Sequence, residues 1–412
     1  MKRIVVKFGG TSIGDGELLR KAAESVCDEF ENGTQIIVVV SAMGSTTDVL
    51  LEGAKQSTEG ELDPKELDEI LSMGERISAR TFASTLCSLG MKAKPILPEH
   101  EKWPVITDSE FGNATPDLDK TRELTKKFIL PLLEDGIVPV ICGFLGKDPK
   151  GNITTLGRGG SDITAFLIGN CIDATDVIIV TDAEGVMSAD PRRIDNPEIL
   201  DEVTADEICD LARYGARILH HHALRYKNPD INARIIHFRH ANLSAKGSMI
   251  VGALKGGERT STELYPKPLA MLTVVGEGMQ TVPGILVKAI KPLSDSDINI
   301  FGVSIGPRSF SLYTTEKESQ KALEVLHDSV KKDEIMKSAT SKSGVGMIVT
   351  ESEKFIDTPG IIAKLSEPLA ENDINVLEIY SSQASISFFV NWEDREKAFE
   401  LLKKEMEEME VQ

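Results

Sequence analysis

The 412-residue sequence has few cysteines, few aromatic residues and no long apolar run. Its five cysteines are odd in number and lack paired spacing, which argues against a disulfide framework or a zinc site. The adjacent histidines at 220–222 would point about 100° apart on a helix, so no metal site is expected there. No stretch approaches 18 apolar residues, and the apolar run after Arg3 is too short for a signal peptide. We therefore expect a cytoplasmic protein that does not bind membranes.

Positive charge is also scarce. Lys and Arg together number 46 against 65 Asp and Glu, for a formal net charge of −19. Phosphate backbones and anionic lipids are bound by clustered Lys and Arg, so nucleic acid and membrane surfaces are excluded as main partners. Hydrophobic residues make up 41% of the chain, which is typical of a globular protein. A chain of 412 residues exceeds the limit of about 250–300 for one core, so two or more domains are expected.

Residues 4 to about 240 alternate short β-branched runs with longer amphipathic segments. After the first run, IVVKF, further strands are expected at 35–42, 93–97, 137–142, 176–182 and 233–238. A long helix is expected to begin at Asp63 and Pro64, with its inward positions at Leu67, Ile70, Leu71, Ile77, Phe82 and Leu86. This alternation predicts a mostly parallel sheet covered by helices on both faces. Ligands of such sheets bind beyond the carboxyl ends of the strands.

The remainder of the chain repeats itself. TVPGILVKAIKPLSDSDINI from Thr281 aligns with DTPGIIAKLSEPLAENDINV from Asp357, a shift of 76 positions (359 − 283 for the two prolines). Each copy predicts a strand, a Pro-Gly turn, an amphipathic helix, an Asp-Ile-Asn turn and a strand. The expected division is a catalytic domain at 1–253, a linker at 254–267, and modules at 268–335 and 343–412.

A lysine and two glycines follow the first strand in the segment KFGGTS. Backbone N–H groups, a nearby helix terminus and the Lys7 ammonium would together suit a phosphate. The segment is not a Walker loop, because its lysine precedes the glycines. The alternative is a plain strand-to-helix turn with an exposed lysine.

The segment TTLGRGGSD holds one arginine among three glycines. Arg158 suits bidentate recognition of a carboxylate, and N–H groups of Gly159 and Gly160 could reach the same anion. Ser161 and Asp162 are expected to cap the helix that follows. The segment therefore predicts a carboxylate pocket at a helix start, against the alternative of a flexible turn with a cap.

Two further places carry candidate site residues. Thr181 and Asp182 end an expected strand, where an acidic side chain would organise Mg²⁺ or a catalytic lysine. Arg192, farther along the same loop, would contact nucleotide phosphates; the alternative is a turn with a surface salt bridge. Glu75 lies in the middle of the long helix and is either a site residue or a solvated charge.

In this order, the motifs resemble those of aspartate kinases, which have an amino-acid kinase fold followed by tandem ACT-type modules. The resemblance covers nearly the whole chain, through KFGGTS, VVSAMGSTTD, GERIS, VPVICGFLG, TTLGRGGSD, TDAEGVMSADPR and YGARILH. It implies an α/β protein with a mostly parallel sheet in an αβα sandwich, plus two ACT-type α/β modules. It also implies an enzyme that uses ATP and Mg²⁺ to phosphorylate the β-carboxylate of L-aspartate, the first step towards lysine, threonine and methionine.

The resemblance implies roles for single residues. Lys7 would contact the transferring phosphoryl group, Asp182 would hold Lys7 or water around Mg²⁺, and Arg158 would clamp the substrate α-carboxylate. The other aspartate-site residues would be Ser41, Thr47, Glu75, Gly159, Gly160, Ser161 and Asp162. The other ATP-site residues would be Gly9, Gly10, Thr181, Met187, Arg192 and Arg217. Many relatives have tyrosine, lysine and proline where this chain has Met187, Arg217 and His221.

The two modules imply a homodimer and feedback inhibition by threonine or lysine. The effector residues would be Thr281, Pro283, Gly284 and Asn299, or their counterparts Asp357, Pro359, Gly360 and Asn375. A purely structural role of one copy in dimerisation is the alternative. Two other functions stay open: the same fold acting on N-acetylglutamate, carbamate or a nucleoside monophosphate, and an inactive kinase domain that serves as an amino-acid sensor.

Overall fold

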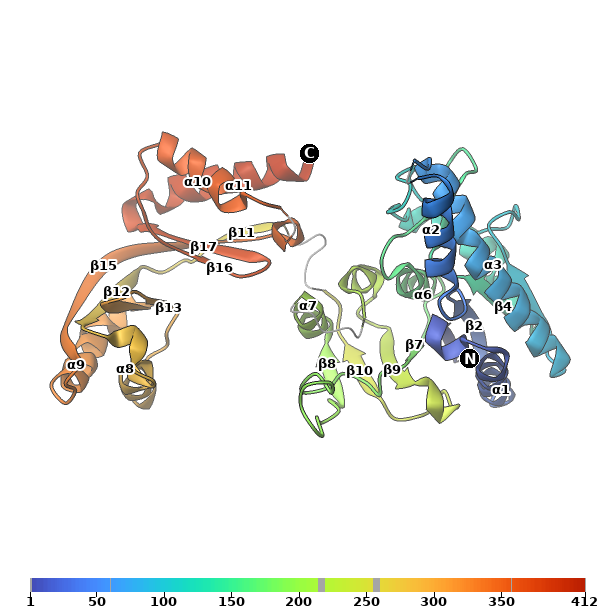
Figure 1. Cartoon of the computed structure of the whole chain (residues 1–412), viewed down its shortest axis with the longest axis horizontal. Helices are drawn as coiled ribbons and strands as arrows, with labels where there is room; N and C mark the ends of the chain where they lie inside the picture. Colours follow the sequence, from blue (N-terminus) through green and yellow to red (C-terminus); the bar gives the residue numbers. More distant parts are fainter. Residues whose placement is uncertain (1, 60, 214–218, 255–259, 357, 412) are drawn as a thin grey trace. The chain divides into compact units, whose positions relative to one another are not determined.

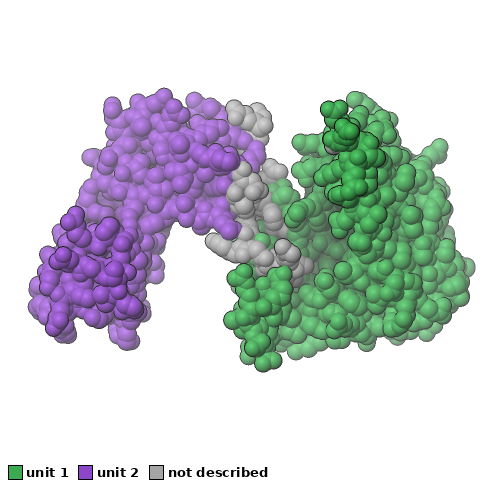
Figure 2. Space-filling model, in the orientation of Figure 1, with its two compact units in different colours: residues 1–257 green, residues 258–412 purple. Residues whose placement is uncertain are grey.

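The computed structural model describes residues 2–59, 61–213, 219–254, 260–356 and 358–411. The chain divides into two compact units, residues 1–257 and 258–412, which are coloured separately in Figure 2. In the part of the chain that the structure describes, no helix combines the length and the apolar composition that a membrane crossing requires.

The first unit is built on an eight-stranded sheet in the order β3-β4-β2-β1-β7-β9-β10-β8 (Figure 1). Its strands are β1 (Arg3–Phe8), β2 (Gln35–Val40), β3 (Ala93–Ile96), β4 (Val138–Cys142), β7 (Asp176–Thr181), β8 (Glu202–Thr204), β9 (Asn232–His237) and β10 (Ser248–Val251). All neighbours pair in parallel except β9 and β10. The predicted strands and the mostly parallel sheet are confirmed. Continuous apolar runs such as β2 suit a sheet that is buried on both faces.

The segments between these strands form helices and one short hairpin. The helices are η1 (Gly10–Ile13), α1 (Gly16–Glu31), α2 (Thr46–Ser57), α3 (Pro64–Ser88), α4 (Leu118–Phe128), α5 (Leu130–Glu134), α6 (Gly160–Cys171), α7 (Ala205–Arg213), η2 (His221–Tyr226) and η3 (Phe238–His240). The hairpin consists of β5 (Leu145–Lys147) and β6 (Ile153–Thr155). Helix α3 begins as predicted, since Asp63 accepts a hydrogen bond from the N–H of Lys65 and Pro64 opens the first turn.

Side-chain alternation along β1 decides where its lysine points. The ring of Phe8 lies 5.2 Å from that of Phe82 on α3. Val5 lies on the other face, where a Cβ added to Gly169 of α6 would stand 3.9 Å from its methyl group. Because alternate residues of a strand share a face, Lys7 lies on the same side as Val5. The lysine is therefore directed towards α6.

One stripe along α3 is buried, but only half of it is apolar. Phe82 and Leu86 are buried as predicted, whereas the same stripe continues through the buried polar residues Asp68 and Glu75. The prediction that Ile77 points inward is wrong, because its side chain is 57% exposed. Two residues beyond Glu75, it lies about 200° around the helix from that side chain. Glu75, in the polar half of this buried stripe, lines the cleft described below.

The second unit contains the repeat. Its strands are β11 (Ser261–Leu264), β12 (Leu269–Gly276), β13 (Gly302–Ile305), β14 (Ser309–Thr315), β15 (Met336–Glu351), β16 (Val376–Ser381) and β17 (Ser385–Asn391). Its helices are η4 (Met279–Thr281), α8 (Ile285–Asp295), η5 (Glu316–Glu318), α9 (Ser319–Val330), η6 (Glu353–Ile356), α10 (Ile361–Glu371), η7 (Trp392–Asp394) and α11 (Arg395–Val411). The predicted repeat is confirmed down to backbone geometry. Gly284 and Gly360 have φ values of 81° and 82°, and Asp297 and Asp373 have φ values of 58° and 56°.

Strand β15 joins the two modules. It pairs with β12 in one module and with β17 in the other. Strand β11 also pairs with β15 and completes the second module, although it lies in the segment predicted to be a linker. Figure 1 shows α8 and α9 on one side of this unit and α10 and α11 on the other. Between them Tyr313 packs on Phe389 with ring centroids 4.1 Å apart, and its hydroxyl donates to Glu378 over 2.7 Å.

Candidate active site

A cleft of about 310 Å³ opens in the first unit at the carboxyl ends of β1 and β2. Its walls come from the loops after these strands, from α3, and from the segment that leads into α6. The lining residues are Lys7, Gly10, Ser41, Ala42, Gly44, Thr47, Glu75, Phe144, Gly157, Gly159, Gly160, Ser161 and Asp162. All the predicted aspartate-site residues except Arg158 lie here, together with Lys7 and Gly10. Arg158 is exposed and does not line the cleft.

Lys7 forms an ion pair with Asp162 inside the cleft. The distance from Nζ to Oδ1 is 2.6 Å, and the two side chains are only 11% and 13% exposed. The sequence predicted that Asp182 would hold either Lys7 or water around Mg²⁺; in this structure the partner of Lys7 is Asp162. Because Asp162 lies in the first turn of α6, the partial positive charge of the helix terminus also stabilises its carboxylate. The pair holds an ammonium group at the end of β1 with little exposure to water.

The glycine-rich segment starts α6 differently from the prediction. The helix begins at Gly160, and its N-cap Gly159 has a left-handed φ of 73° with no side-chain cap. A Cβ at Gly159 would lie 2.2 Å from the Cβ of His220, so this position has no room for another residue. The expectation that Ser161 and Asp162 cap the helix is therefore wrong. Both lie inside the first turn, which leaves the Asp162 carboxylate to pair with Lys7.

Glu75 is a buried site residue rather than a solvated charge. Its side chain is 3% exposed, and Oε1 accepts a hydrogen bond from the N–H of Ala42 over 3.0 Å. Oε2 is buried with no hydrogen-bond partner. Burial raises the pKa of Glu75 to about 7, although the Ala42 N–H acts in the opposite direction. Because Glu75 lines the cleft, its buried carboxylate oxygen without a donor suits a cationic group of a ligand.

The loops after β1 and β2 approach each other at Gly10. The N–H of Gly44 donates to the Gly10 carbonyl over 3.0 Å. A Cβ at Gly10 would stand 2.7 Å from the Ala42 carbonyl oxygen and 3.1 Å from that of Gly44. Gly9 does not supply the donor expected of it, because its N–H donates to the Val180 carbonyl over 3.1 Å. The glycine loop is thus fixed to β7 on one side and to the β2 loop on the other.

We expect Gly10→Ala to lower kcat by about 100-fold, because the loop that carries Lys7 must move by a fraction of an ångström or more. The matched control is Gly14→Ala, whose new Cβ would make ordinary contacts of 3.5 Å with Gly10 and Thr11. Steady-state phosphoryl transfer by both variants measures the difference. Equal activity of the two variants would show that this close approach does not matter.

Of the predicted nucleotide residues, Gly10 lines the cleft, whereas Thr181, Asp182, Met187 and Arg192 do not. Thr181 and Asp182 end β7, which pairs with β1, and Asp182 is exposed and accepts a hydrogen bond from the Thr181 hydroxyl over 3.2 Å. Met187 is half-buried and forms a bridge with Ile199. Arg192 makes two hydrogen bonds of 3.0 and 2.9 Å to the carboxylate of Asp190. Arg217 lies outside the described residues.

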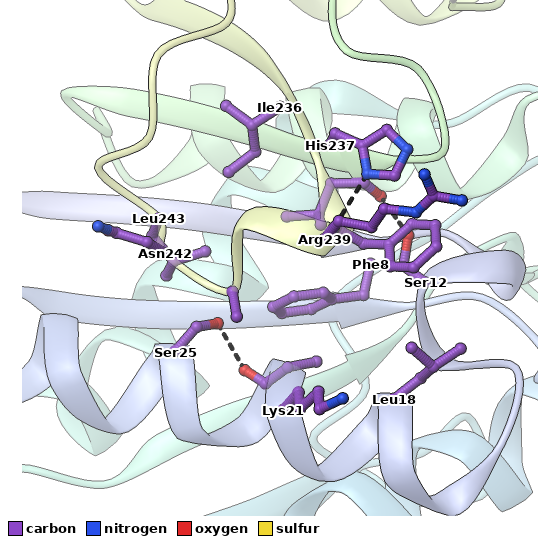
Figure 3. A pocket seen from close by; sticks show the side chains of 14 residues that line it. Phe8, Ser12, Leu18, Lys21, Ser25, Ile236, His237, Arg239, Asn242 and Leu243 are labelled. Carbon is purple, nitrogen blue, oxygen red and sulfur yellow. Dashed lines mark hydrogen bonds between the residues drawn. The ribbon is translucent and has the colours of Figure 1, made fainter.

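A smaller hollow of about 140 Å³ lies between α1, the end of β9 and the segment around η3 (Figure 3). Its polar groups bond to neighbouring protein groups: the Ser12 hydroxyl donates to the Val180 carbonyl, and the Arg239 N–H donates to Nδ1 of His237. Burial lowers the pKa of His237. None of the predicted site residues lines this hollow, so the larger cleft is the candidate active site.

Four lining residues of the cleft were not predicted as site residues, namely Ala42, Gly44, Phe144 and Gly157, and a buried carboxylate on α3 was also missed. Phe144 lines the cleft from the turn after β4, with a positive φ of 68°. Asp68 is fully buried on α3 and bonds to Gly112 and Thr155, where a carboxylate was not expected. A signal for Asp68 was present, since it precedes Glu75 by seven residues and so shares a helical face with it.

The predicted effector residues lie on the surface of the second unit. Thr281, Pro283, Gly284 and Asn299 in the first module are exposed, as are Pro359, Gly360 and Asn375 in the second. Asp357 lies outside the described residues. Gly284 and Gly360 start α8 and α10 at equivalent places, so the structure gives both modules the same turn.

Comparisons with known proteins agree with this architecture. Residues 2–237 match the amino acid kinase family, and residues 272–330 and 340–404 each match an ACT domain. The chain is 31% identical over 410 residues to an aspartokinase of Thermus thermophilus, covering 97% of each chain. It is 31% identical over 420 residues to an aspartokinase of Mycolicibacterium smegmatis, covering 98% of this chain and 95% of the relative.

Solved structures share the fold. Aspartate kinase from Synechocystis superposes with a TM-score of 0.81 at 24% identity, over 98% of this chain and 69% of that one. E. coli aspartokinase III superposes with a TM-score of 0.56 at 22% identity, over 98% and 99% of the two chains. With the family match over the kinase unit and near-complete coverage of both relatives, this chain belongs to the aspartokinases of the amino acid kinase family, with two ACT domains following the kinase domain.

Proposed function

We propose that this protein transfers the γ-phosphoryl group of ATP to the β-carboxylate of L-aspartate, which gives 4-phospho-L-aspartate. The observation that carries the proposal is the cleft itself, which is lined by the Lys7–Asp162 pair and by Glu75, a carboxyl with one unpartnered oxygen. The relatives' shared name supports aspartate as the acceptor, and E. coli aspartokinase III has been solved with aspartate and ADP. The product would start the route towards lysine, threonine and methionine.

The acceptor needs no general base. An aspartate β-carboxylate has an ordinary pKa of about 3.9, so it is ionised at neutral pH. The obstacle is repulsion, since two unit charges 4 Å apart repel by about 4 kcal/mol at an effective dielectric of 20. Lys7 provides the nearest buried positive charge, and its pairing with Asp162 keeps that charge in place before substrate binds. As charge shifts from the leaving oxygen to the acceptor, this ammonium stabilises the transition state more than the ground state.

The α-ammonium and α-carboxylate of the substrate would fix its orientation. Glu75 would accept the ammonium, because Oε2 has no hydrogen-bond partner and is buried. Arg158 would clamp the α-carboxylate from the glycine-rich segment. Its side chain is exposed in this structure, so the clamp would form as substrate arrives. An acyl phosphate hydrolyses readily, and closing this segment over the substrate would exclude water.

ATP would lie at the ends of β1 and β7, with Thr181, Asp182, Met187, Arg192 and Arg217 around it. Among the residues with described positions, no group of three His, Cys, Asp or Glu side chains could hold a metal ion. Mg²⁺ commonly binds through one or two carboxylates and the substrate phosphates, and the exposed Asp182 carboxylate fits that pattern. Bound there, the ion would neutralise phosphate charge. Arg192 would exchange its bonds with Asp190 for the nucleotide.

The test is hydroxylamine trapping of the acyl phosphate with ATP, Mg²⁺ and a panel of acceptors. Product that depends on aspartate would support the proposal. Product only with N-acetylglutamate or carbamate would move the function to a sister kinase, and phosphorylation of a nucleoside monophosphate would be followed as ADP release. A folded, ATP-binding protein that is inactive with every acceptor would instead be an amino-acid sensor.

Regulation would lie in the second unit. The strands β13 and β16 stand at the two ends of the strand order of its seven-stranded sheet, and such edges pair readily with a second copy. We expect a homodimer through the ACT domains, and inhibition by threonine or lysine bound near Asn299 or Asn375. Titrating each amino acid against the wild type, Asn299→Ala and Asn375→Ala measures this. If one variant is no longer inhibited, the substituted module is the one that binds the amino acid. If the wild type itself is not inhibited, both modules have a structural role.

A further inference from the structure

Asp68 is a fully buried carboxylate with a complete set of hydrogen-bond donors. Oδ2 accepts from the N–H of Gly112 over 2.9 Å and from the N–H of Thr155 over 2.8 Å. Oδ1 accepts from the hydroxyl of Thr155 over 2.7 Å. The side chain has no solvent exposure and does not line the cleft, so it has no direct part in binding the acceptor. Its donors come from two segments that are far from α3 in the sequence.

These hydrogen bonds fix the position of the residues that lead into the glycine-rich segment. Thr155 ends β6 and precedes Gly157, the first cleft residue of that segment, by two positions. The carbonyl of Thr155 accepts the N–H of Ala114 over 2.8 Å, which ties in the loop that also carries Gly112. A Cβ at Gly157 would stand 2.4 Å from the Asn113 side chain, so this loop and the segment are closely packed. Asp68 bonds to both, through the N–H groups of Gly112 and Thr155.

Helix α3 carries both Asp68, which anchors the glycine-rich segment, and Glu75. Seven residues separate Asp68 from Glu75, which is about two turns of helix, so the two carboxylates share one face. Glu75 is bonded to the β2 loop through Ala42, and Asp68 is bonded to the end of β6 through Thr155. Helix α3 therefore sets the separation between the proposed ammonium site and the segment proposed to bind the α-carboxylate.

We propose that Asp68 is a positioning residue for the acceptor: it holds the Gly157–Ser161 segment at a fixed distance from Glu75. This inference rests on the proposed function of the cleft as the acceptor site. A substrate held at both its ammonium and its carboxylate depends on that distance, whereas ATP does not. Loosening the anchor raises KM for the acceptor and leaves KM for ATP nearly unchanged.

The chemistry of the anchor offers a conservative replacement. In Asp68→Asn the amide oxygen would still accept the two N–H groups, and its NH₂ would donate to the Thr155 hydroxyl, which would rotate to accept. Asp68→Ala leaves all three donors without this acceptor, and the two donors of Thr155 are buried. A matched control is Asp148, a buried carboxylate that accepts bonds from Asn152 and Ser109 but none from Thr155.

The experiment compares the full-length wild type with Asp68→Ala, Asp68→Asn and Asp148→Ala, measuring kcat, both KM values and thermal unfolding. We expect Asp68→Ala to raise KM for aspartate by at least about 10-fold, which corresponds to the loss of one or two buried hydrogen bonds. Asp68→Asn should remain within about threefold of the wild type. Asp148→Ala should lower the unfolding temperature without this change in KM.

Two results would overturn the inference: an unchanged KM for aspartate in folded Asp68→Ala, or an equal rise in Asp148→Ala. If Asp68→Ala does not fold, Thr155→Ala removes only the hydroxyl donor and must show the same selective rise in KM. The wild type separates this test from the proposed function. If it uses another acceptor, aspartate is the wrong substrate, and the KM comparison is made with that acceptor.

Discussion

Lys7→Ala is expected to lower kcat by about 1000-fold while the protein still binds aspartate, because the buried ammonium acts mainly on charge that develops during transfer. Lys7 is 9% exposed and lies against Asp162, so no other side chain of the cleft lining offers a positive charge in its place. The measurement is single-turnover formation of the acyl phosphate, trapped as hydroxamate, at saturating ATP and aspartate. Activity within tenfold of the wild type would remove Lys7 from the proposed mechanism.

A second variant separates the chemical effect from an effect on folding. Lys7→Ala leaves the Asp162 carboxylate buried without its partner, and an unpaired buried charge costs about 3–5 kcal/mol. Lys7→Ala/Asp162→Asn removes that charge and should recover most of the lost stability in urea unfolding, yet remain inactive. A double variant that regained activity would show that the single variant failed through misfolding alone.

The Lys7–Asp162 ion pair also shows what could not be predicted from the sequence. Lys7 was found from its place at the end of a strand, and Asp162 from its place at a helix start, but 154 other residues separate them in the chain. Which carboxylate meets the lysine depends on how β1 faces α6, through the contact of Val5 with Gly169. Asp182, one strand away, was an equally reasonable partner until that packing was known. Local patterns thus predicted the participants and not the pairing.

The same limit applies to the elements. The strands of the first unit and the repeat of the second unit could be predicted, because the spacing of apolar residues and the turn residues are visible within a short stretch of sequence. Strand β11 could not, since its polar sequence STEL becomes a strand only by pairing with β15 near Thr350 and Glu351. The position of Ile77 was predicted wrongly for a related reason. A helix that covers a polar site buries its carboxylates, so apolar spacing no longer marks the inward face.

The second large effect is expected for Glu75→Gln. The pKa of Glu75 is raised by burial to about 7, from an ordinary value of 4.5. A carboxyl with a raised folded-state pKa contributes stability fully below the unfolded-state pKa and loses it as pH rises through the folded-state pKa. A difference of one pKa unit corresponds to about 1.36 kcal/mol, so between pH 4.5 and 8 the free energy of unfolding of the wild type should fall by about 3 kcal/mol relative to that of Glu75→Gln. Urea unfolding of both proteins at several pH values measures this difference.

Asp148→Asn is the control of opposite sign. Burial acts to raise the pKa of Asp148, but hydrogen bonds from Asn152, Ser109 and Lys150 outweigh it, and the pKa is lowered. Its contribution to stability is present above the unfolded-state pKa and lost as pH falls, so the wild type should gain relative to this variant at higher pH. If the stability of the wild type relative to Glu75→Gln rose with pH, as expected for Asp148→Asn, Glu75 would not be a buried acid.

The stability gained in Glu75→Gln should be accompanied by a loss of function. An ionised Glu75 would bind the aspartate ammonium, so in the wild type KM for aspartate should fall as pH rises through about 7. Glu75→Gln should raise the KM for aspartate by about 100-fold at pH 8, which corresponds to the loss of a charged hydrogen bond of about 2–3 kcal/mol. The variant should also lose the pH dependence of this KM. KM for ATP should stay the same. A pH-independent KM in the wild type would mean that Glu75 does not receive the ammonium. The raised pKa and the unpartnered oxygen have one cause, the burial of the Glu75 carboxyl group, and both would be relieved if a substrate ammonium bound there.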